Sequence, residues 1–368
     1  MRIECVQEKI KEAIVLAERI VGKHMTLPVL SCFFLEASKN NTLTIKATNL
    51  DLGIEIVIPA KTEEAGSATV PGSTLASFVG GLNEFDKNIK LDLDQGNLKI
   101  RTSRGSGVIK TLPHEDFPSI PRVSSGTTFM INGVEFVKGL KSVWYSSSVS
   151  SVKPELSSVF VYCEDGYVVF VATDSFRLAE KKIKTKKDKD FGQILIPHKN
   201  IPEIMRVLEN IDDDVEVNLD KNQISFIYKG IFLISRVIDG SFPDYKQIIP
   251  KSYITEATVL RQDLINALKL SNIFSDKFNQ VNVKINPSSN KCEIRTKNND
   301  VGENITSLEA VVTGDALEIN FNYKYIIDSF QSIDSDSVTL CFGGLNKPMV
   351  INPVSDQTFR YLVMPMNR

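Results

Sequence analysis

The sequence predicts an α+β fold built from three tandem copies of one unit, each with two helices set on β-sheets. Three features recur in the same order and at nearly constant spacing. They are an amphipathic helix, a strand that ends in threonine and a polar turn, and a strand–helix–hairpin segment. Three ordered matches are explained by repetition better than by chance. The predicted domains are residues 1–124, 125–250 and 251–368.

Each predicted domain opens with an amphipathic helix. Apolar residues follow helical spacing within residues 6–21, 131–145 and 259–274. In the first of these segments, Ile10, Ile14 and Ala17 fall on one face. The spacing therefore predicts a helix in each segment with one stripe buried against the rest of its domain.

The second recurring feature is a strand with a threonine at or near its end. Strands are predicted at residues 43–49, 168–174 and 292–298, and their threonines are Thr48, Thr173 and Thr296. Polar residues follow each threonine, which predicts a turn at the same place in every copy.

The third recurring feature is a short helix followed by two strands. Helices are predicted at residues 74–82, 201–208 and 324–330. The strand pairs that follow are 89–93 with 98–102, 215–219 with 224–228, and 338–342 with 349–351. Two helices cannot cover both faces of the sheets in a domain. We therefore expect helices on one face and sheet-on-sheet packing on the other.

Composition describes an ordinary globular chain. The 368 residues exceed what a single core usually holds, and the net charge of −2 lacks the basic excess of proteins that grip nucleic acid tightly. The chain has no run of 18 apolar residues and no signal-peptide pattern at its N-terminus, which predicts a cytoplasmic protein without membrane segments. Five cysteines without a CxxC pair predict reduced core thiols.

No pattern in the sequence indicates catalysis. There is no Ser-His-Asp arrangement, Walker loop, GxGxxG or metal-spaced cluster. The acidic residues 212–214, Asp334 and Asp336 precede strands and are typical of turns, while Asp92 and Asp94 lack a metal-type partner set. We therefore expect no enzyme activity, no catalytic residue, no metal and no cofactor.

Six sequence segments carry a family resemblance. They are LPHEDFPSIP (112–121), SRVIDGSFPDYKQIIP (235–250), YLVMPMNR (361–368), LPVLSCFFLEA (27–37), ATNLDLGIEI (47–56) and VATDSFRLAEKKI (171–183). In these segments, and in their order along the whole chain, the sequence resembles the bacterial sliding clamp, the beta subunit of DNA polymerase III.

The resemblance implies a processivity factor rather than an enzyme. Clamps of this family form a head-to-tail homodimer whose six domains close into a ring around duplex DNA, with helices lining the hole. A β-rich repeat protein that binds other ligands and does not act on DNA is the alternative.

The resemblance also implies a pocket between the second and third domains. It would take short peptides bearing leucine and an aromatic residue from the polymerase III alpha subunit, the clamp loader, other polymerases and repair proteins. The matching positions are Leu156, Thr173, Ser175, Phe176, Arg177, Leu178, Pro243, Gln247, Ile248, Leu362, Val363, Met364, Pro365 and Met366. Apolar walls suit such anchors, and flexible methionine side chains tolerate varied partners.

Two departures bear on which peptides this pocket prefers. The family commonly has Gly-His where this chain has Ser175 and Phe176, and a basic residue where it has Gln247. An ordinary core strand is the alternative for the apolar C-terminal segment.

The remaining candidate contacts concern DNA and the dimer seam. Lys23, His24 and Lys153 match family positions near DNA, and Lys199 and Arg206 are basic residues on or beside a helix. A solvent-facing helix carries such residues in any protein, so this alternative stays open. The resemblance places Ile273 and Phe274 opposite Ile109 at the seam, with Gly107 where the family has an aromatic residue. Ordinary core packing is the alternative for Ile273 and Phe274.

Overall fold

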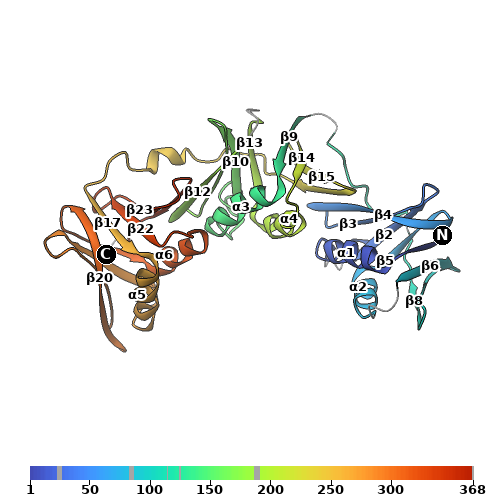
Figure 1. Ribbon diagram of the computed structural model, residues 1–368, viewed down its shortest axis with the longest axis horizontal. Coiled ribbons are helices and arrows are strands. Elements are labelled where there is room, and N and C mark those ends of the chain that lie inside the picture. Colours follow the sequence, from blue (N-terminus) through green and yellow to red (C-terminus); the bar gives the residue numbers. More distant parts are fainter. Residues whose placement is uncertain (23–26, 83–86, 114, 124–125, 186–190, 367–368) are drawn as a thin grey trace. The chain divides into compact units, whose positions relative to one another are not determined.

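The computed structural model describes the chain except residues 23–26, 83–86, 114, 124–125, 186–190 and 367–368. It contains two compact units (Figure 1). Unit 1 consists of Met1–Val134 and Lys199–Val237, and unit 2 consists of Glu135–His198 and Ile238–Arg368. Residues of the predicted central domain contribute to both units. The three-domain boundaries of the repeat therefore remain a prediction.

Unit 1 is organised around one continuous antiparallel sheet. Its main path runs β8-β7-β6-β1-β4-β16-β15-β14-β9, and β2, β3 and β5 branch from β4. The strands are β1 (Arg2–Val6), β2 (Cys32–Ser38), β3 (Thr42–Thr48), β4 (Leu52–Glu64), β5 (Gly66–Pro71), β6 (Asn88–Asp94), β7 (Asn97–Arg101), β8 (Ser106–Lys110), β9 (Thr127–Asn132), β14 (Asp214–Leu219), β15 (Gln223–Tyr228) and β16 (Ile231–Arg236). Helix α1 (Gln7–Glu18) packs on α2 (Gly72–Gly80), β3 and β4, and α4 (Ile201–Leu208) completes the unit.

Unit 2 contains a second continuous sheet. The order is β13-β10-β11-β12-β24-β23-β22-β17-β20-β19-β18-β21. The strands are β10 (Ser158–Glu164), β11 (Tyr167–Thr173), β12 (Arg177–Lys184), β13 (Gln193–Pro197), β17 (Thr255–Leu260), β18 (Gln280–Asn286), β19 (Lys291–Asn298), β20 (Gly302–Gly314), β21 (Leu317–Asn322), β22 (Ser337–Phe342), β23 (Met349–Pro353) and β24 (Phe359–Val363). Helix α5 (Arg261–Ile273) packs on α6 (Tyr323–Ser329) and on β19 and β20, while α3 (Gly133–Val143) enters the unit from Glu135 onward.

The predicted helices and hairpins are confirmed. All six predicted helical segments form within about three residues of their expected bounds, and the expected strand pairs form as β6 with β7, β14 with β15, and β22 with β23. The apolar stripe of the first helix is buried, as Ile10, Ile14 and Ala17 are each at most 2% exposed. Burial of such stripes stabilises helices that propensity alone would leave marginal.

The threonine turns are built alike in the first two copies. Thr48 Oγ1 donates to the carbonyl of Leu52 at 2.8 Å and accepts from the amide of Leu50. Thr173 Oγ1 does the same with Arg177 at 2.6 Å and with Ser175. Leu50 and Ser175 both have positive φ, +74° and +79°. The side-chain hydroxyl thus closes the same left-handed turn twice.

The third threonine has a different environment. Thr296 is buried, and its hydroxyl has no hydrogen-bond partner among the described residues. Here β19 continues to Asn298, which pairs with Gly302. The predicted strand and the polar turn after it thus form in the third copy, but the threonine does not close that turn.

The cysteines are free, as predicted, and four of the five are buried. Burial raises the pKa of the Cys5 and Cys292 thiols to about 12, so both stay protonated and behave as small apolar side chains. Among the described residues, no helix is long and apolar enough to cross a membrane.

The single tryptophan lies in unit 2 against a histidine. The rings of Trp144 and His198 are 5.1 Å apart, and His198 Nδ1 is 2.7 Å from the hydroxyl of Ser147. Burial lowers the pKa of His198, because the charged imidazolium loses hydration there. The folded unit therefore favours neutral His198.

We expect unit 2 to lose stability as acid protonates His198. With the folded-state pKa below the unfolded value of about 6.5, the unfolded chain binds more protons in this range, so the free energy of unfolding falls as pH drops through it. Urea unfolding followed by Trp144 fluorescence between about pH 7.5 and 5 should show a steeper loss in the parent than in His198→Gln. Equal slopes would contradict this.

Candidate functional site

The turn between β11 and β12 is held by side chains on both sides. Besides the Thr173 hydroxyl, the Asp174 carboxylate accepts from the amides of Phe176 at 2.9 Å and Arg177 at 3.0 Å. Ser175 occupies the left-handed region at the tip. The turn leaves the Phe176 side chain 59% exposed. A large apolar group held out by a fixed backbone is a feature of a binding surface.

Arg177 connects segments that are far apart in sequence. Its Nε donates to Asp174 Oδ2 at 2.9 Å, its Nη1 to Asp328 Oδ2 at 2.5 Å and its Nη2 to the carbonyl of Tyr145 at 2.8 Å. The guanidinium also lies over the Tyr325 ring at 4.9 Å. Three nitrogens thus serve three acceptors, a geometry that a planar fork supplies and a single ammonium does not.

The C-terminal segment runs beside this turn. Strand β24 pairs with β12, placing Val363 opposite Arg177 and Leu362 opposite Leu178. Beyond the strand, the amide of Met364 donates to the carbonyl of Phe176 and that of Met366 to Asn320, both at 2.8 Å. The side chains of Met364, Pro365 and Met366 are half-buried.

The two alternatives for the C-terminal segment apply to different parts of it. Leu178, Leu362 and Val363 are at most 1% exposed and belong to the interior of unit 2. The core-strand interpretation thus describes Leu362 and Val363, which form the floor beneath any surface site. The partly exposed residues 364–366 remain candidates for the surface.

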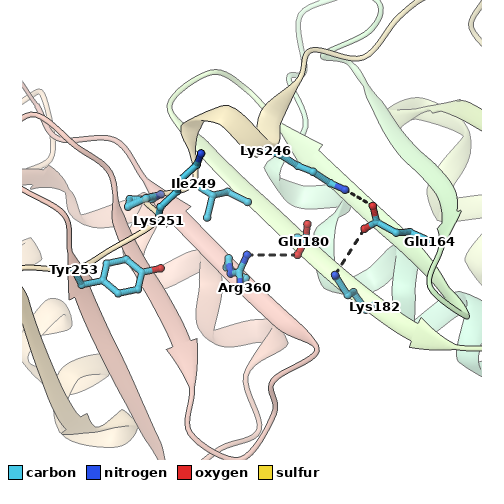
Figure 2. Close-up of a pocket in the computed structure, with 9 residues that line it drawn as sticks. Glu164, Glu180, Lys182, Lys246, Ile249, Lys251, Tyr253 and Arg360 are labelled. Atoms are coloured by element: carbon cyan, nitrogen blue, oxygen red, sulfur yellow. Dashed lines mark hydrogen bonds and ion pairs between the residues drawn. The ribbon is translucent and has the colours of Figure 1, made fainter.

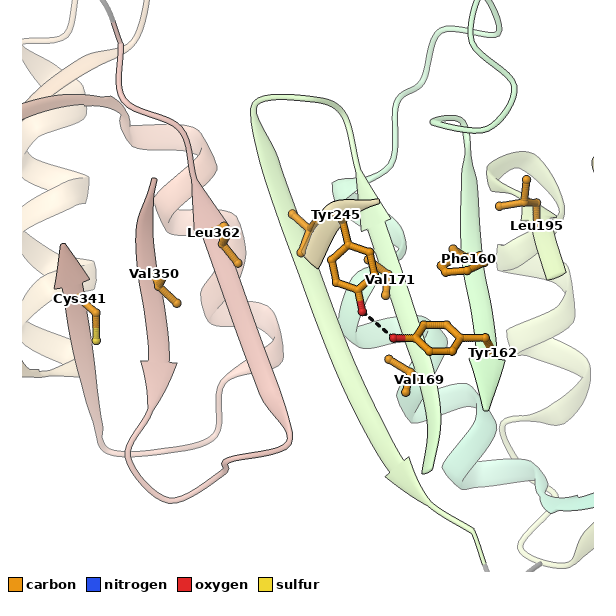
Figure 3. Packing of buried hydrophobic residues seen from close by; sticks show 10 residues of the cluster. Phe160, Tyr162, Val169, Val171, Leu195, Tyr245, Cys341, Val350 and Leu362 are labelled. Atoms are coloured by element: carbon orange, nitrogen blue, oxygen red, sulfur yellow. Dashed lines mark hydrogen bonds between the residues drawn. The ribbon is translucent and has the colours of Figure 1, made fainter. Parts of the chain in front are cut away.

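The segment of residues 243–248 is anchored by a buried tyrosine. Tyr245 donates to Glu180 Oε2 at 2.6 Å, and its hydroxyl is 2.7 Å from that of Tyr162 (Figure 3). Burial, with Glu180 adding to it, raises the pKa of Tyr245, so the phenol stays a donor. Pro243, Gln247 and Ile248 are exposed, and Gln247 bonds to Asp244 at 2.9 Å. Leu156 is buried in the turn before β10.

Sequence reasoning missed four contributors to this region: Tyr145, Asn320, Tyr325 and Asp328. Phe176 stacks on Tyr325 at 6.3 Å, which extends the apolar surface onto α6. The signal was the pair of tyrosines, Tyr323 and Tyr325, at the start of a helix whose buried side needs only one of them.

A separate cavity of about 530 Å³ lies where residues 249–253 pass β12 and β24. Figure 2 shows that its walls are mostly charged: Glu164 pairs with Lys182 and Lys246, and Glu180 lies 4.0 Å from Arg360. Such a lining does not suit leucine and aromatic anchors, so this cavity is distinct from the Phe176–Met364 surface.

The DNA candidates differ in their surroundings. Lys153 is exposed, Lys199 pairs with Asp51 Oδ2 at 2.6 Å, and Arg206 donates to the carbonyl of Val15 at 3.3 Å. Lys199 and Arg206 thus already have partners within unit 1. Lys23 and His24 lie outside the described residues.

The seam candidates also differ in exposure. Ile273 is 62% exposed, so core packing is excluded for it, and Phe274 is half-buried. Ile109 is only 6% exposed because its side chain points into unit 1, which leaves neighbouring Val108, 63% exposed, as the apolar side chain outside. At Gly107 an added Cβ would lie 2.5 Å from the Phe78 ring, so a larger residue there would require that ring to move.

Comparison with known proteins identifies the family. Models of the DNA polymerase III beta subunit match residues 1–121 (N-terminal domain), 130–244 (central domain) and 246–367 (C-terminal domain). The "Beta sliding clamp" of Synechocystis sp. is 27% identical over 387 residues, covering 100% of this chain and 99% of that protein. The chain belongs to the DNA polymerase III beta subunit family, the bacterial sliding clamps.

Solved structures agree with this assignment. The DNA polymerase III beta subunit of Thermotoga maritima is 26% identical with a TM-score of 0.93, covering 100% of this chain and 99% of that one. The Pseudomonas aeruginosa subunit is 23% identical with a TM-score of 0.94 over 100% of both chains, and another structure of that clamp is bound to griselimycin. The fold of three clamp domains is therefore established.

Arg177→Lys should destabilise unit 2 by about 2 kcal/mol, because one ammonium cannot serve three acceptors that are partly buried. Urea unfolding followed by Trp144 fluorescence measures this. Arg295→Lys is the matched control. Among the residues that the structure describes, Arg295 pairs only with its strand neighbour Glu293, so its change should stay within about 0.5 kcal/mol. Equal effects of the two substitutions would argue against the bridging role of Arg177.

Proposed function

We propose that this chain is a DNA sliding clamp: a head-to-tail homodimer that encircles duplex DNA and tethers the replicative polymerase and other replication and repair proteins. Family membership supports the general function. One structural observation supports the assembly. The same kind of strand pairing occurs twice within the chain, and the two strands that would form it a third time each have an unpaired edge.

The repeat makes the open edges recognisable. Strands β4, β12 and β20 follow the three threonine-bearing strands, and β8, β16 and β24 each lie near the end of one predicted domain. Within the chain, β4 pairs with β16 and β12 pairs with β24. The remaining equivalents are β20 and β8.

Both of these remaining strands have an unpaired edge. Strand β8 ends the sheet of unit 1, with only β7 beside it among the described strands. In β20, residues 302–309 pair with β19 on one side, and β17 pairs only from Ala310 onward. We infer that β8 of one copy pairs with the open edge of β20 in the next. The two edges differ, so the contact is heterologous and runs head to tail.

Side chains near the two edges complement each other. Val108 on β8 and Ile273, Val301 and Ile305 beside or on β20 are each 58% to 63% exposed. Lys110 flanks the first edge, and Glu303 flanks the second. Apolar side chains buried at the centre, with opposite charges around them, are typical of a protein interface. In this proposal Ile109 contributes backbone rather than side chain.

A sliding clamp must stay on DNA while binding it only weakly, so that it can move along the duplex. Each contact with a DNA phosphate adds salt-dependent affinity. A net charge of −2 keeps this electrostatic affinity for DNA low. Lys153 is the described candidate most available to DNA; Lys199 and Arg206 would first have to leave their partners. We infer that retention on DNA comes from ring closure and requires neither catalysis nor a cofactor.

The surface of residues 173–177, Tyr325 and residues 364–366 is the proposed partner site. Phe176 and Tyr325 supply aromatic surface, and Met364 and Met366 supply adaptable apolar contacts. Burying roughly 200 Å² of apolar peptide surface contributes about 5 kcal/mol before entropy is lost. That magnitude suits partners that exchange: the polymerase alpha subunit, the clamp loader and repair proteins.

Ile273→Asp should dissociate the dimer, because the interface would bury an unpaired carboxylate. Light scattering after size exclusion should then report the single-chain mass of 41.0 kDa. Val354→Asp, an exposed valine of unit 2 at a loop remote from β20 in sequence, should leave the dimer unchanged. A dimer that survives Ile273→Asp would contradict this seam.

Met364→Ala combined with Met366→Ala should weaken binding of a short leucine–phenylalanine peptide at least about tenfold, because two apolar contacts of roughly 1 kcal/mol each are lost. Fluorescence anisotropy measures the binding, and light scattering should show an intact dimer. Loss of the dimer instead would mean that both methionines support the fold.

Retention on DNA tests the whole proposal. The protein, loaded on nicked circular duplex, should stay bound through gel filtration at high salt and should leave when the circle is cut once. If the protein stayed bound to the linear DNA, it would be held by direct affinity and not by a closed ring. Failure to bind either form would favour a β-rich repeat protein that does not act on DNA.

A further inference from the structure

Unit 1 contains a second turn of the same construction as the partner site. Thr48 closes it as Thr173 closes the other, and Leu50 and Ser175 share the left-handed conformation. The amide of Arg236 donates to the carbonyl of Asp51 at 2.8 Å, as the amide of Met364 does to Phe176. The β4–β16 pairing is thus equivalent to the β12–β24 pairing, and Arg236 occupies the place of Met364.

A cavity of about 660 Å³ opens at this turn. Leu50, Ile120, Pro121 and Val237 give it apolar walls, and Arg236 also lines it. Ligand pockets of proteins commonly hold about 300 to 1,000 Å³, so the space suffices for a short peptide with one anchor side chain.

The wall formed by Ile120 is held in place. The neighbouring Arg122 lies over the Phe232 ring at 3.6 Å and forms an ion pair with Glu55. Ile120 itself packs into the notch at Gly53, where an added Cβ would lie only 2.9 Å from the isoleucine. The cavity is therefore formed without a ligand, which lowers the entropic cost of binding.

Leu50 and Arg236 give the cavity its chemistry. Leu50 is 49% exposed, although its φ of +74° is unfavourable for a leucine. Arg236 is exposed, and no acidic side chain among the described residues forms an ion pair with it. Asp51 also lines the cavity, but its carboxylate is paired with Lys199 at 2.6 Å. The cavity thus offers an apolar surface beside one unbalanced positive charge.

We propose that this cavity is a second peptide-binding site, selective for an extended partner segment that carries a leucine-type anchor and a neighbouring carboxylate. The proposal rests on the proposed function for the class of partner. Arg236 in place of Met364 changes the preference, because a guanidinium binds a carboxylate through paired hydrogen bonds and a thioether does not. One chain would then hold two peptides of different charge.

Methyl NMR of the full-length dimer, labelled at isoleucine and methionine methyls, tests this directly. The probes are the peptides acetyl-Asp-Leu-Phe-amide and acetyl-Asn-Leu-Phe-amide, which differ by one charge. The Asp peptide should shift the methyl signals of Ile120 and Ile234, and the Asn peptide should do so about tenfold more weakly. Shifts at Met364 report the partner site in the same sample.

Three variants separate the two sites. Arg236→Gln should weaken the Asp-peptide response at Ile120 about tenfold, and Leu50→Asn, which tolerates the same backbone, should also weaken it. Met364→Ala with Met366→Ala should leave the response at Ile120 unchanged.

Each outcome has a distinct meaning. Shifts at Ile120 that survive the methionine variant and are weakened by Arg236→Gln support the second site. If the Ile120 methyl signal does not shift while that of Met364 does, the second site is refuted and the partner site is supported. The same holds if the shift at Ile120 is lost only in the methionine variant. No shift at either methyl would refute both sites.

Discussion

The antiparallel pairing of β12 with β24 is the constraint on which the proposed partner site depends. It sets Leu178 against Leu362 inside the unit and brings the chain end to the turn that presents Phe176. A strand pair fixes direction and register together, so residues 364–366 leave the sheet at one defined place. Without that register, the aromatic and methionine side chains would not share a surface.

A buried tyrosine in residues 243–248 reinforces this pairing. Tyr245 bridges Glu180 on β12 and Tyr162 on β10, so the segment before the last domain is tied to the same sheet. Lys181, only 4% exposed, pairs with Asp356 just before β24. Breaking either contact would leave a buried charge or carboxylate without its partner, which costs more than the contact itself is worth. These polar contacts therefore select one arrangement of the segments, whereas apolar packing alone would allow several.

The sequence supported the repeating elements well and the contacts between them poorly. Periodicity in the sequence predicted the six α-helices of the described residues, because burial of one stripe is a local pattern. The three acceptors of Arg177 come from residues 145, 174 and 328, and no local pattern relates these positions. Likewise, the spacing of β8 cannot tell whether Ile109 or Val108 faces outward, since a shift of one residue reverses a strand. Thr296 does not close a turn, because its strand continues to Asn298 and pairs there with Gly302 in a hairpin. The amino-acid composition of this segment did not indicate that difference.

In the proposed head-to-tail dimer, the two open strand edges would carry a cost for the chain before it pairs with a second copy. Unpaired backbone amides and carbonyls accept any extended segment that reaches them, including one from a misfolded neighbour. Different edges that join head to tail form filaments whenever the angle between successive copies fails to close. Under this proposal, the free monomer is the species most exposed to misassembly. Charges lie at both edges: Glu303 near the start of β20 and Lys110 at the end of β8. Such charges disfavour pairing with a strand that lacks the opposite charge.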